Sequence, residues 1–318
     1  MIVIPRVLRP AALLTVLLSV VASPEPAVAQ DMPLPDALQV CREIFDPVGA
    51  PDGRDGADDN SYVFANGSKP KLPVPPFVFR CHSNAFAVRR NGITRVPDWV
   101  AEDITPDEAI GNAQRSNKFF VAPGDEAYSA TLADYAGSDY DRGHQAPAGD
   151  FAGDKVKQDE SFVMSNMGPQ VGRCFNRGIW RDLEIAVRSL VTTRGRLIVF
   201  TGPIFERPLR TLQDWIKERD KIKPLDPAAE AAREANDQPP QSAAIPDAFF
   251  KIVYDPQRGR AMTFRLPNKE LCKRSYADPE FRTTIDAVEE KTGFNFLDAI
   301  TLRQQRVLEN ESSPFWTW

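Results

Sequence analysis

Histidine is scarce in this chain, with only His82 and His144 among its 318 residues. Histidine is the side chain whose ordinary pKa best suits proton transfer near neutral pH, so acid–base chemistry based on histidine has few candidates. The scarcity also disfavours a metal site built from two histidines, because the polar motif downstream of His144 offers asparagines instead. The four cysteines form no C-x-x-C pair, which disfavours a zinc site.

An excess of positive charge is also missing, because the formal net charge is −5. Strong non-specific binding to nucleic acid depends on neutralising phosphates, so the composition disfavours a protein that coats nucleic acid. It does not exclude an enzyme, which needs only a locally positive cleft. Several arginines do lie close together in the sequence: Arg115, Arg142, Arg173, Arg177 and Arg181. Alternatively, Arg173 and Arg188 belong to a solvent-exposed face with scattered charges and have no role in a cleft.

Long apolar runs are absent after the N-terminus. Arg6 and Arg9 precede an apolar run at 11–22, and Ala27-Val28-Ala29 forms an A-x-A cleavage pattern. These features predict a signal peptide at 1–29 and a secreted or periplasmic protein. The run is short for a membrane span, so no stable membrane insertion is expected after cleavage, and an uncleaved anchor is the alternative.

An even number of cysteines in an exported chain suggests two disulfides, for which three pairings exist. Free buried thiols are the alternative. We expect Cys41–Cys81 and Cys174–Cys272, since each bond would tie one end of the chain to the core. The second bond would also brace the segment just before Asn176.

The motif Asp141-Arg142-Gly143-His144 carries the clearest chemistry. His144 can act as a general base, and the Arg142 guanidinium can hold a phosphate oxygen in a bidentate grip. Gly143 lets backbone or substrate approach closely. Phosphodiester hydrolysis needs a base next to a group that binds the phosphate anion. Taken alone, these four residues could instead form a turn that contains one hydrogen-bonded histidine.

A second cluster follows at Ser165–Gln170 and Asn176–Glu184. Together the two clusters read D-R-G-H, then N-x-x-P-Q, then N-x-x-x-W-x-x-L-E. In this order and spacing the pattern resembles the DNA/RNA non-specific endonucleases, a family that includes secreted sugar-non-specific nucleases and mitochondrial endonuclease G. Other segments, such as residues 97–100, 201–205 and 246–251, are similar to the family more weakly. They extend the resemblance over roughly residues 80 to 300.

The resemblance implies a role for each motif residue. His144 is the general base, and Asn176 is the single protein ligand of Mg²⁺, for which Mn²⁺ could substitute; one protein oxygen suffices because Mg²⁺ keeps most of its water. Arg142 and Arg115 bind phosphate. Glu184 orients a metal-bound water or an arginine, or else only pairs with Arg188. Further expectations cover three positions: Asn166 positions the substrate phosphate or the catalytic loop, or forms a turn; Asp141 fixes local geometry; His82 and Trp180 are structural.

The resemblance also implies a Mg²⁺-dependent endonuclease that hydrolyses DNA, RNA or both to products with 5′-phosphate and 3′-hydroxyl ends. Two alternatives stay open. One is a phosphodiesterase of the same fold that acts on small nucleotides, and the other is a catalytically silent nucleic-acid-binding envelope protein. The sequence leaves the oligomeric state open, a homodimer included.

We expect an α+β fold in which a mixed or antiparallel sheet is flanked by helices and carries a ββα-metal motif. The expected organisation is a lead-in and loop at 30–76 and a nuclease domain at 77–318, with a polar insertion at about 206–243. Patterning predicts strands at 77–90, 95–105, 162–164, 197–200, 249–254 and 261–266, and helices at 212–222 and 281–291.

One more helix, roughly 176 to 191, has an apolar stripe at Ile179, Leu183, Val187 and Leu190. If this helix begins at Asn176, then Glu184 stands about 80° away around its axis, so that both side chains can border one cleft.

Overall fold

The computed structural model describes residues 31–32, 41–53, 77–206, 208–222 and 242–310. The expected signal peptide at 1–29 and residues 223–241 of the expected insertion lie outside these ranges. Among the described residues, no helix combines the length and the apolar character needed to cross a membrane.

A single antiparallel sheet organises the molecule, and in the described ranges it has eight strands in the order β1-β3-β4-β5-β8-β9-β10-β11. Strands β4, β5, β8 and β9 are buried along their whole length, because helices cover both faces. The strands are β1 (Asp31–Met32), β3 (Phe77–His82), β4 (Phe86–Asn91), β5 (Trp99–Ile104), β8 (Leu197–Ile204), β9 (Ala248–Asp255), β10 (Arg260–Pro267) and β11 (Arg282–Thr283).

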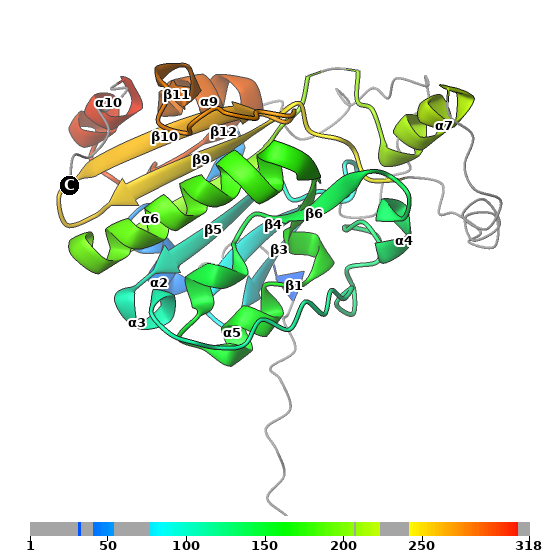
Figure 1. Cartoon of the computed structure of the whole chain (residues 1–318). Coiled ribbons are helices and arrows are strands. Elements are labelled where there is room, and N and C mark those ends of the chain that lie inside the picture. Colours follow the sequence, from blue (N-terminus) through cyan, green and yellow to red (C-terminus); the bar gives the residue numbers. More distant parts are fainter. Residues whose placement is uncertain (1–30, 33–40, 54–76, 207, 223–241, 311–318) are drawn as a thin grey trace, which may run out of the picture.

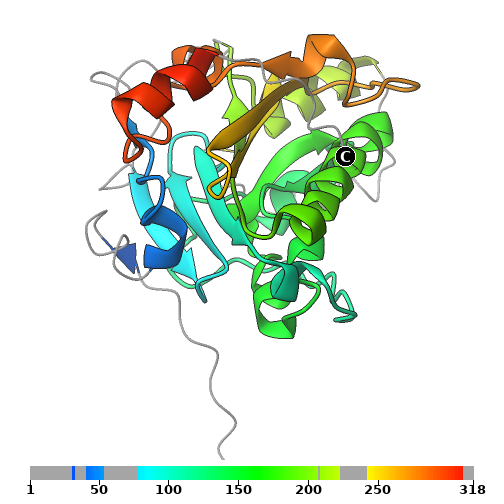
Figure 2. The same cartoon turned by 90° about the vertical axis from the view of Figure 1, so that its left-hand side faces the viewer.

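Helices pack on both faces of this sheet (Figures 1 and 2). Helix α6 (Arg181–Arg194) lies across one face, where its stripe Leu183, Val187 and Leu190 packs on Val199 and Val253. On the opposite face, α2 (Arg42–Phe45), α9 (Ile285–Thr292) and α10 (Leu302–Asn310) cover a second apolar cluster that includes Trp99, Phe200 and Phe250. The expected α+β class is confirmed.

Shorter elements complete the chain and lie mostly at the edges of the sheet. The helical ones are α3 (Pro106–Ala109), α4 (Leu132–Tyr135), η1 (Ala148–Phe151), α5 (Lys155–Glu160), η2 (Met164–Asn166), α7 (Leu212–Ile222) and η4 (Pro279–Phe281). Two further strands, β2 (Asp52–Gly53) and β12 (Phe294–Asn295), pair with each other.

The Asp141–His144 motif lies on a separate two-stranded antiparallel hairpin. Strand β6 (Tyr140–His144) pairs antiparallel with β7 (Met167–Val171), so that His144 lies opposite Met167 and Gly143 opposite Gly168. The chain then runs through η3 (Gly172–Trp180) into α6, which completes the ββα unit that the sequence implied.

Several predicted elements differ from the observed ones. The strand expected at 77–90 is two strands, because Ser83 and Asn84 take positive φ values and form a tight turn. The segment 162–164 forms no strand, because Val163 makes only an isolated bridge to Phe120. The strand in this part of the chain is β7, which begins at Met167. The helix expected to begin at 281 begins at Ile285, where the Thr284 side chain accepts the Ala287 N–H as an N-cap.

The helix predicted at about 176–191 also begins later than expected. Helix α6 starts at Arg181, and Asn176 lies before it in η3, where Gly178 takes the non-helical angles φ −132° and ψ −113°. Asn176 and Glu184 are therefore not related by a regular helical turn. The kink, rather than helical periodicity, sets their relative direction.

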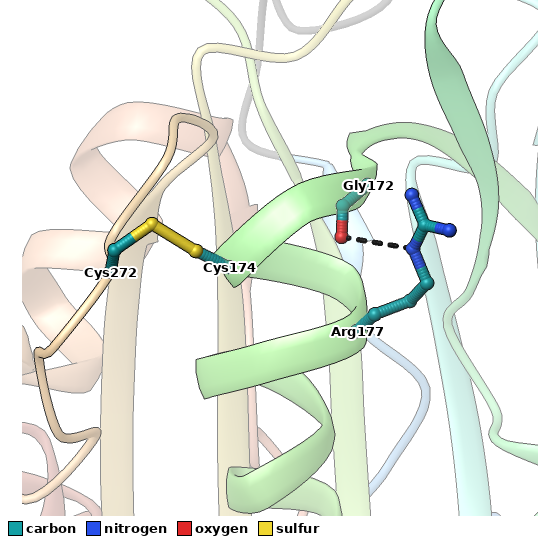
Figure 3. Close-up of a disulfide and its surroundings, with 4 residues drawn as sticks. All are labelled: Gly172, Cys174, Arg177 and Cys272. Atoms are coloured by element: carbon teal, nitrogen blue, oxygen red, sulfur yellow. Dashed lines mark hydrogen bonds between the residues drawn. A yellow bond between two sulfur atoms is a disulfide. The ribbon is translucent and has the colours of Figure 1, made fainter.

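Both expected disulfides are present. Cys41–Cys81 ties the segment before α2 to β3, and Cys174–Cys272 ties η3 to the loop after β10 (Figure 3). Cys174 has a φ of 61°, so the second bond holds a residue in left-handed backbone conformation two positions before Asn176.

Candidate active site

A cleft of about 200 Å³ lies at the end of the β6–β7 hairpin. It brings together five of the six predicted site residues, which come from three separate stretches of the chain. These are His144, Arg142, Arg115, Asn176 and Glu184; Pro147, Ala148, Arg177 and Arg181 complete the lining. Asn166, the sixth, is not among the lining residues.

Two phenylalanine rings hold the His144 imidazole in place. The Phe162 ring meets it edge-to-face with centroids 5.0 Å apart, and the Phe119 ring lies 5.7 Å away. His144 is only 8% exposed, and its Nε2 atom has no hydrogen-bond partner among the described residues. The ring therefore has a fixed orientation and one nitrogen that is not already engaged.

The same two rings carry the two arginines of the cleft. The Arg142 guanidinium lies 4.2 Å from the centre of the Phe119 ring, and that of Arg115 lies 4.9 Å from the centre of Phe162. Burial first, and then the positive charges of Arg115 and Arg142, lower the pKa of His144 to about 3. The imidazole is consequently neutral at neutral pH, which is the form a general base needs.

Gly143 is required by packing beneath the strand. A Cβ atom at this position would lie 2.1 Å from Cδ of Gln170, whose side chain is fully buried on the paired strand β7. The sequence suggested that backbone or substrate approaches Gly143 closely, and in the structure it is the Gln170 side chain that does so. It lets the hairpin close tightly under His144.

Asn176 is oriented by the first residue of the D-R-G-H motif. Its Nδ2 donates to Oδ2 of Asp141 over 2.9 Å, which leaves the amide Oδ1 as the acceptor that can serve a cation. Arg177 also contacts Asp141, with Nε 3.1 Å from the same Oδ2, and donates to the Gly172 carbonyl (Figure 3). Asp141 thus fixes local geometry, as the sequence suggested.

Glu184 stands above a buried group of charges that sequence reasoning missed. Strands β5, β8 and β9 place Glu102, Thr201 and Lys251 on the face that α6 covers, and Lys251 Nζ donates to Thr201 Oγ1 over 2.6 Å. Arg188 donates to Asp150 over 2.7 Å instead of serving only as a helical neighbour of Glu184. These residues are far apart in the sequence and come together only through the pairing of β5, β8 and β9, so their spacing in the sequence does not predict the group.

Burial and, to a smaller extent, these charges shift the pKa values of the carboxyl groups. Burial raises the pKa of Glu184 to about 7, a shift that Lys251 opposes and Asp150 reinforces. Burial, and then the Asp150 carboxylate, raise the pKa of Glu102 well above its usual value. Glu102 is 1% exposed, and among the described residues neither of its oxygens has a hydrogen-bond partner. A neutral Glu102 beneath an ionisable Glu184 is what this environment favours.

The remaining candidates are buried away from the cleft. Asn166 is fully buried, and its side chain bonds to the backbone of Ala146 in both directions and donates to the Ser161 carbonyl. It therefore anchors the loop that follows His144. Trp180 is fully buried in the core, and His82 is 3% exposed and stacked on Phe86.

Comparisons with known proteins show which family the chain resembles. Residues 76–301 match the family described as DNA/RNA non-specific endonuclease. The chain is 35% identical to the mitochondrial nuclease of Saccharomyces cerevisiae over 234 residues, which span 70% of this chain and 66% of the yeast protein. It is 32% identical to nuclease C1 of Cunninghamella echinulata over 223 residues, 68% of this chain and 81% of that protein.

A solved structure is similar as well. The crystal structure of the EndoG/EndoGI complex contains a chain that superimposes with a TM-score of 0.57 at 26% identity, covering 74% of this chain and 91% of that one. The yeast nuclease extends beyond the region it shares with this chain, because the match covers slightly less than two thirds of its length.

The expected secreted or periplasmic location is wrong by the same comparisons. Relatives are named as mitochondrial proteins in Saccharomyces cerevisiae, Schizosaccharomyces pombe and Homo sapiens. The prediction rested on Arg6 and Arg9, on the apolar run at 11–22 and on the A-x-A pattern, and a basic N-terminal segment is a feature that export signals share with mitochondrial transit peptides.

The family expected from the motifs is confirmed. The matched region at 76–301 contains every described strand of the large sheet except β1, together with the β6–β7 hairpin, η3 and α6, and therefore the whole cleft. The chain belongs to the DNA/RNA non-specific endonuclease family.

Proposed function

We propose that this chain is a Mg²⁺-dependent endonuclease that hydrolyses phosphodiester bonds of DNA, RNA or both. The observation that carries the proposal is one cleft in which a neutral, buried imidazole stands beside two arginines, an oriented amide and a carboxyl group. Each group matches one need of the reaction: a base for the attacking water, positive charge for the phosphate, and an anchor for a cation.

His144 takes the proton from the attacking water, because its free imidazole nitrogen is held in a fixed direction by Phe119 and Phe162. Arg142 and Arg115 bind the phosphate oxygens with donors that the same two rings position. Glu184 lies close enough to Arg115 for each to shift the other's pKa, and we assign it the role of orienting that arginine. Asn166 positions the loop after His144.

The cleft fits a hydrated divalent cation held by one protein oxygen. Asn176 presents Oδ1, because Asp141 accepts from its Nδ2. Within the described ranges, no group of three or more His, Cys, Asp or Glu side chains could form a protein cage for a metal ion. Mg²⁺ accepts such a site, since it keeps several waters and often binds one or two protein ligands plus phosphate. When bound, the cation offsets negative charge that develops on the phosphate.

The test is hydrolysis by the purified protein of plasmid DNA, of RNA and of dinucleotides, with Mg²⁺ or with EDTA. We expect Mg²⁺-dependent cleavage of polymers to 5′-phosphate ends and loss of several orders of magnitude in rate for His144→Ala. His82→Ala is the matched control and should retain most activity. Turnover confined to dinucleotides would favour the small-nucleotide phosphodiesterase, and binding without turnover would favour the silent binding protein.

A further inference from the structure

Lys251 places a positive charge in the middle of the large sheet. It lies on β9 and is only 1% exposed, and its side chain points to the face that α6 covers, where Val253 of the same strand also packs. Its Nζ donates to Thr201 Oγ1 over 2.6 Å and lies 5.4 Å from the centre of the Trp180 ring. Neither neighbour is negatively charged, and within the described part of the chain Lys251 forms no ion pair. A buried ammonium group is costly without such compensation, and none of the proposed catalytic roles uses this one.

Three carboxyl groups on three different elements face Lys251. Glu102 belongs to β5, Asp150 to η1 and Glu184 to α6, and each interacts electrostatically with Lys251. One of them already has a cation of its own, because Oδ1 of Asp150 lies 2.7 Å from Nε of Arg188. The charge of Lys251 is therefore available to Glu102 or to Glu184.

Burial decides between these two carboxyl groups. Glu102 is 1% exposed, and among the described residues neither of its oxygens has a hydrogen-bond partner, so its ionised form is costly. Glu184 lines the cleft and is only partly buried, so its ionised form costs less. Arg115 also acts on Glu184 from the cleft side. The arrangement favours one long-range pair, with Lys251 on the sheet and an ionised Glu184 on the helix above it.

We propose that Lys251 is a positioning residue of the cleft: its positive charge keeps Glu184 ionised, so that Glu184 can hold Arg115 towards the phosphate. Lys251 is not among the residues that line the cleft, and it acts only through Glu184. This inference rests on the proposed function and adds a buried residue to it. Burial raises the pKa of Glu184 to about 7, and Lys251 is the strongest influence that opposes the rise. Without Lys251 this carboxyl group would be protonated at neutral pH, and a protonated carboxyl group is a weak partner for a guanidinium.

The other cations around Glu184 do not replace Lys251. Arg188 is paired with Asp150, and Arg115 is the group that Glu184 has to orient. The remaining cations that line the cleft are Arg142, Arg177 and Arg181. The first of these is stacked on the Phe119 ring, and the other two have side chains more than half exposed, so that solvent screens their charges. Lys251 is the unpaired cation that acts on Glu184 from the buried side.

The test measures the ionisation of Glu184 directly, in the metal-free protein, and then its effect on activity. The carboxyl carbons of isotope-labelled glutamate are titrated by NMR, and the Glu184 signal is identified by its loss in Glu184→Gln. The main variant is Lys251→Met, which removes the charge and keeps an unbranched side chain of similar length. Val253→Ala is the matched control, because it removes buried volume from the same face of β9 and changes no charge.

We expect the titration midpoint of Glu184 to rise by about one pH unit in Lys251→Met and to stay unchanged in Val253→Ala. The acidic limb of kcat/KM should move by the same amount, because kcat/KM follows ionisations of the free enzyme, and the pKa of His144, about 3, lies far below this range. If the midpoint moves from about 7 to about 8, activity falls about fivefold at pH 7 and returns close to the wild-type value at about pH 9. A purely structural loss would not recover with pH.

An unchanged Glu184 midpoint in folded Lys251→Met would overturn the inference, and so would an equal rise in Val253→Ala. Glu102→Gln should leave the midpoint unchanged; a lower midpoint would show that Glu102 is the ionised partner of Lys251, which overturns the inference as well. Lys251→Gln replaces Lys251→Met if the latter does not fold. Failure of the proposed function looks different, because wild type would then show no Mg²⁺-dependent hydrolysis while the Glu184 titration still responds to Lys251→Met.

Discussion

Asp141 holds Asn176 through a 2.9 Å hydrogen bond from Nδ2 to Oδ2, and so joins two motifs that lie 35 residues apart. The same oxygen lies 3.1 Å from Nε of Arg177. The first residue of D-R-G-H and the first residue of N-x-x-x-W are therefore physical partners. The aspartate orients the amide of Asn176, while Arg142 and His144 of the same strand line the cleft.

Asp141→Ala should weaken the use of Mg²⁺, because Asn176 loses the partner that fixes its amide. We expect the Mg²⁺ concentration for half-maximal activity to rise about 10- to 100-fold, as is typical for residues that orient a metal ligand. Arg177→Ala is the control: it removes the other partner of Asp141 and should change KM more than the Mg²⁺ titration. Identical Mg²⁺ curves for wild type and Asp141→Ala would refute the positioning role.

Gly143→Ala should destabilise the hairpin, because the new Cβ would overlap the buried Gln170 side chain. Overpacking of this kind costs about 1–3 kcal/mol. A shifted β6 would also displace His144 and Arg142, so activity should fall together with stability. The check is a double-mutant cycle with Gln170→Ala, which removes the overlapping atoms. Stability that fails to recover in the double variant would show that Gln170 is not the obstacle.

The sequence predicted which residues meet in the cleft better than it predicted their geometry. His144, Arg142 and Asn176 were identified because their residue types and spacing match a specific motif. Their relative placement was not predicted. It depends on the kink at Gly178 and on the positive φ of Cys174, and neither feature can be read from the spacing of apolar residues. The turn at Ser83-Asn84 was missed for a similar reason, since the run 77–90 remains apolar on both sides of it.

The buried charges beneath Glu184 could not be predicted at all. Glu102, Asp150 and Lys251 lie on β5, η1 and β9, and they meet only because of the strand order β5-β8-β9 and the packing of α6. Both disulfides, in contrast, were expected among three possible pairings, on the argument that each bond ties one end of the chain to the core. The fold class was also predictable, because short apolar strands and one amphipathic helix are local patterns.

The two disulfides should differ in their effect on activity. Cys174→Ser/Cys272→Ser should lose about 2–4 kcal/mol of stability and most activity, because Cys174 braces η3 two residues before Asn176. Cys41→Ser/Cys81→Ser should lose similar stability and retain activity, because α2 lies on the opposite face of the sheet. Chemical unfolding and initial rates below the unfolding transition measure the two effects separately. Equal residual activity in both variants would contradict the brace.

The pH dependence of stability should include a contribution from His82. Burial first, and then Arg80 and Arg90, lower the pKa of His82 from 6.5 to about 3 in the folded state. Between these two values the unfolded chain binds a proton that the folded protein does not, so stability falls as pH falls from about 6.5 towards 3. At pH 5.5 the loss from one such histidine is about 1.4 kcal/mol relative to pH 7.5.

His82→Gln removes this proton and should flatten the decline. Buried carboxyl groups with raised pKa values, such as Glu102 and Glu184, act in the opposite direction, because they bind protons more readily in the folded state than in the unfolded chain. The informative quantity is therefore the difference between variant and wild type, in which the carboxyl contributions cancel. Free energies of unfolding at pH 7.5 and 5.5 should fall less in His82→Gln by about 1.4 kcal/mol. Parallel pH profiles for the two proteins would mean that His82 does not take up a proton on unfolding.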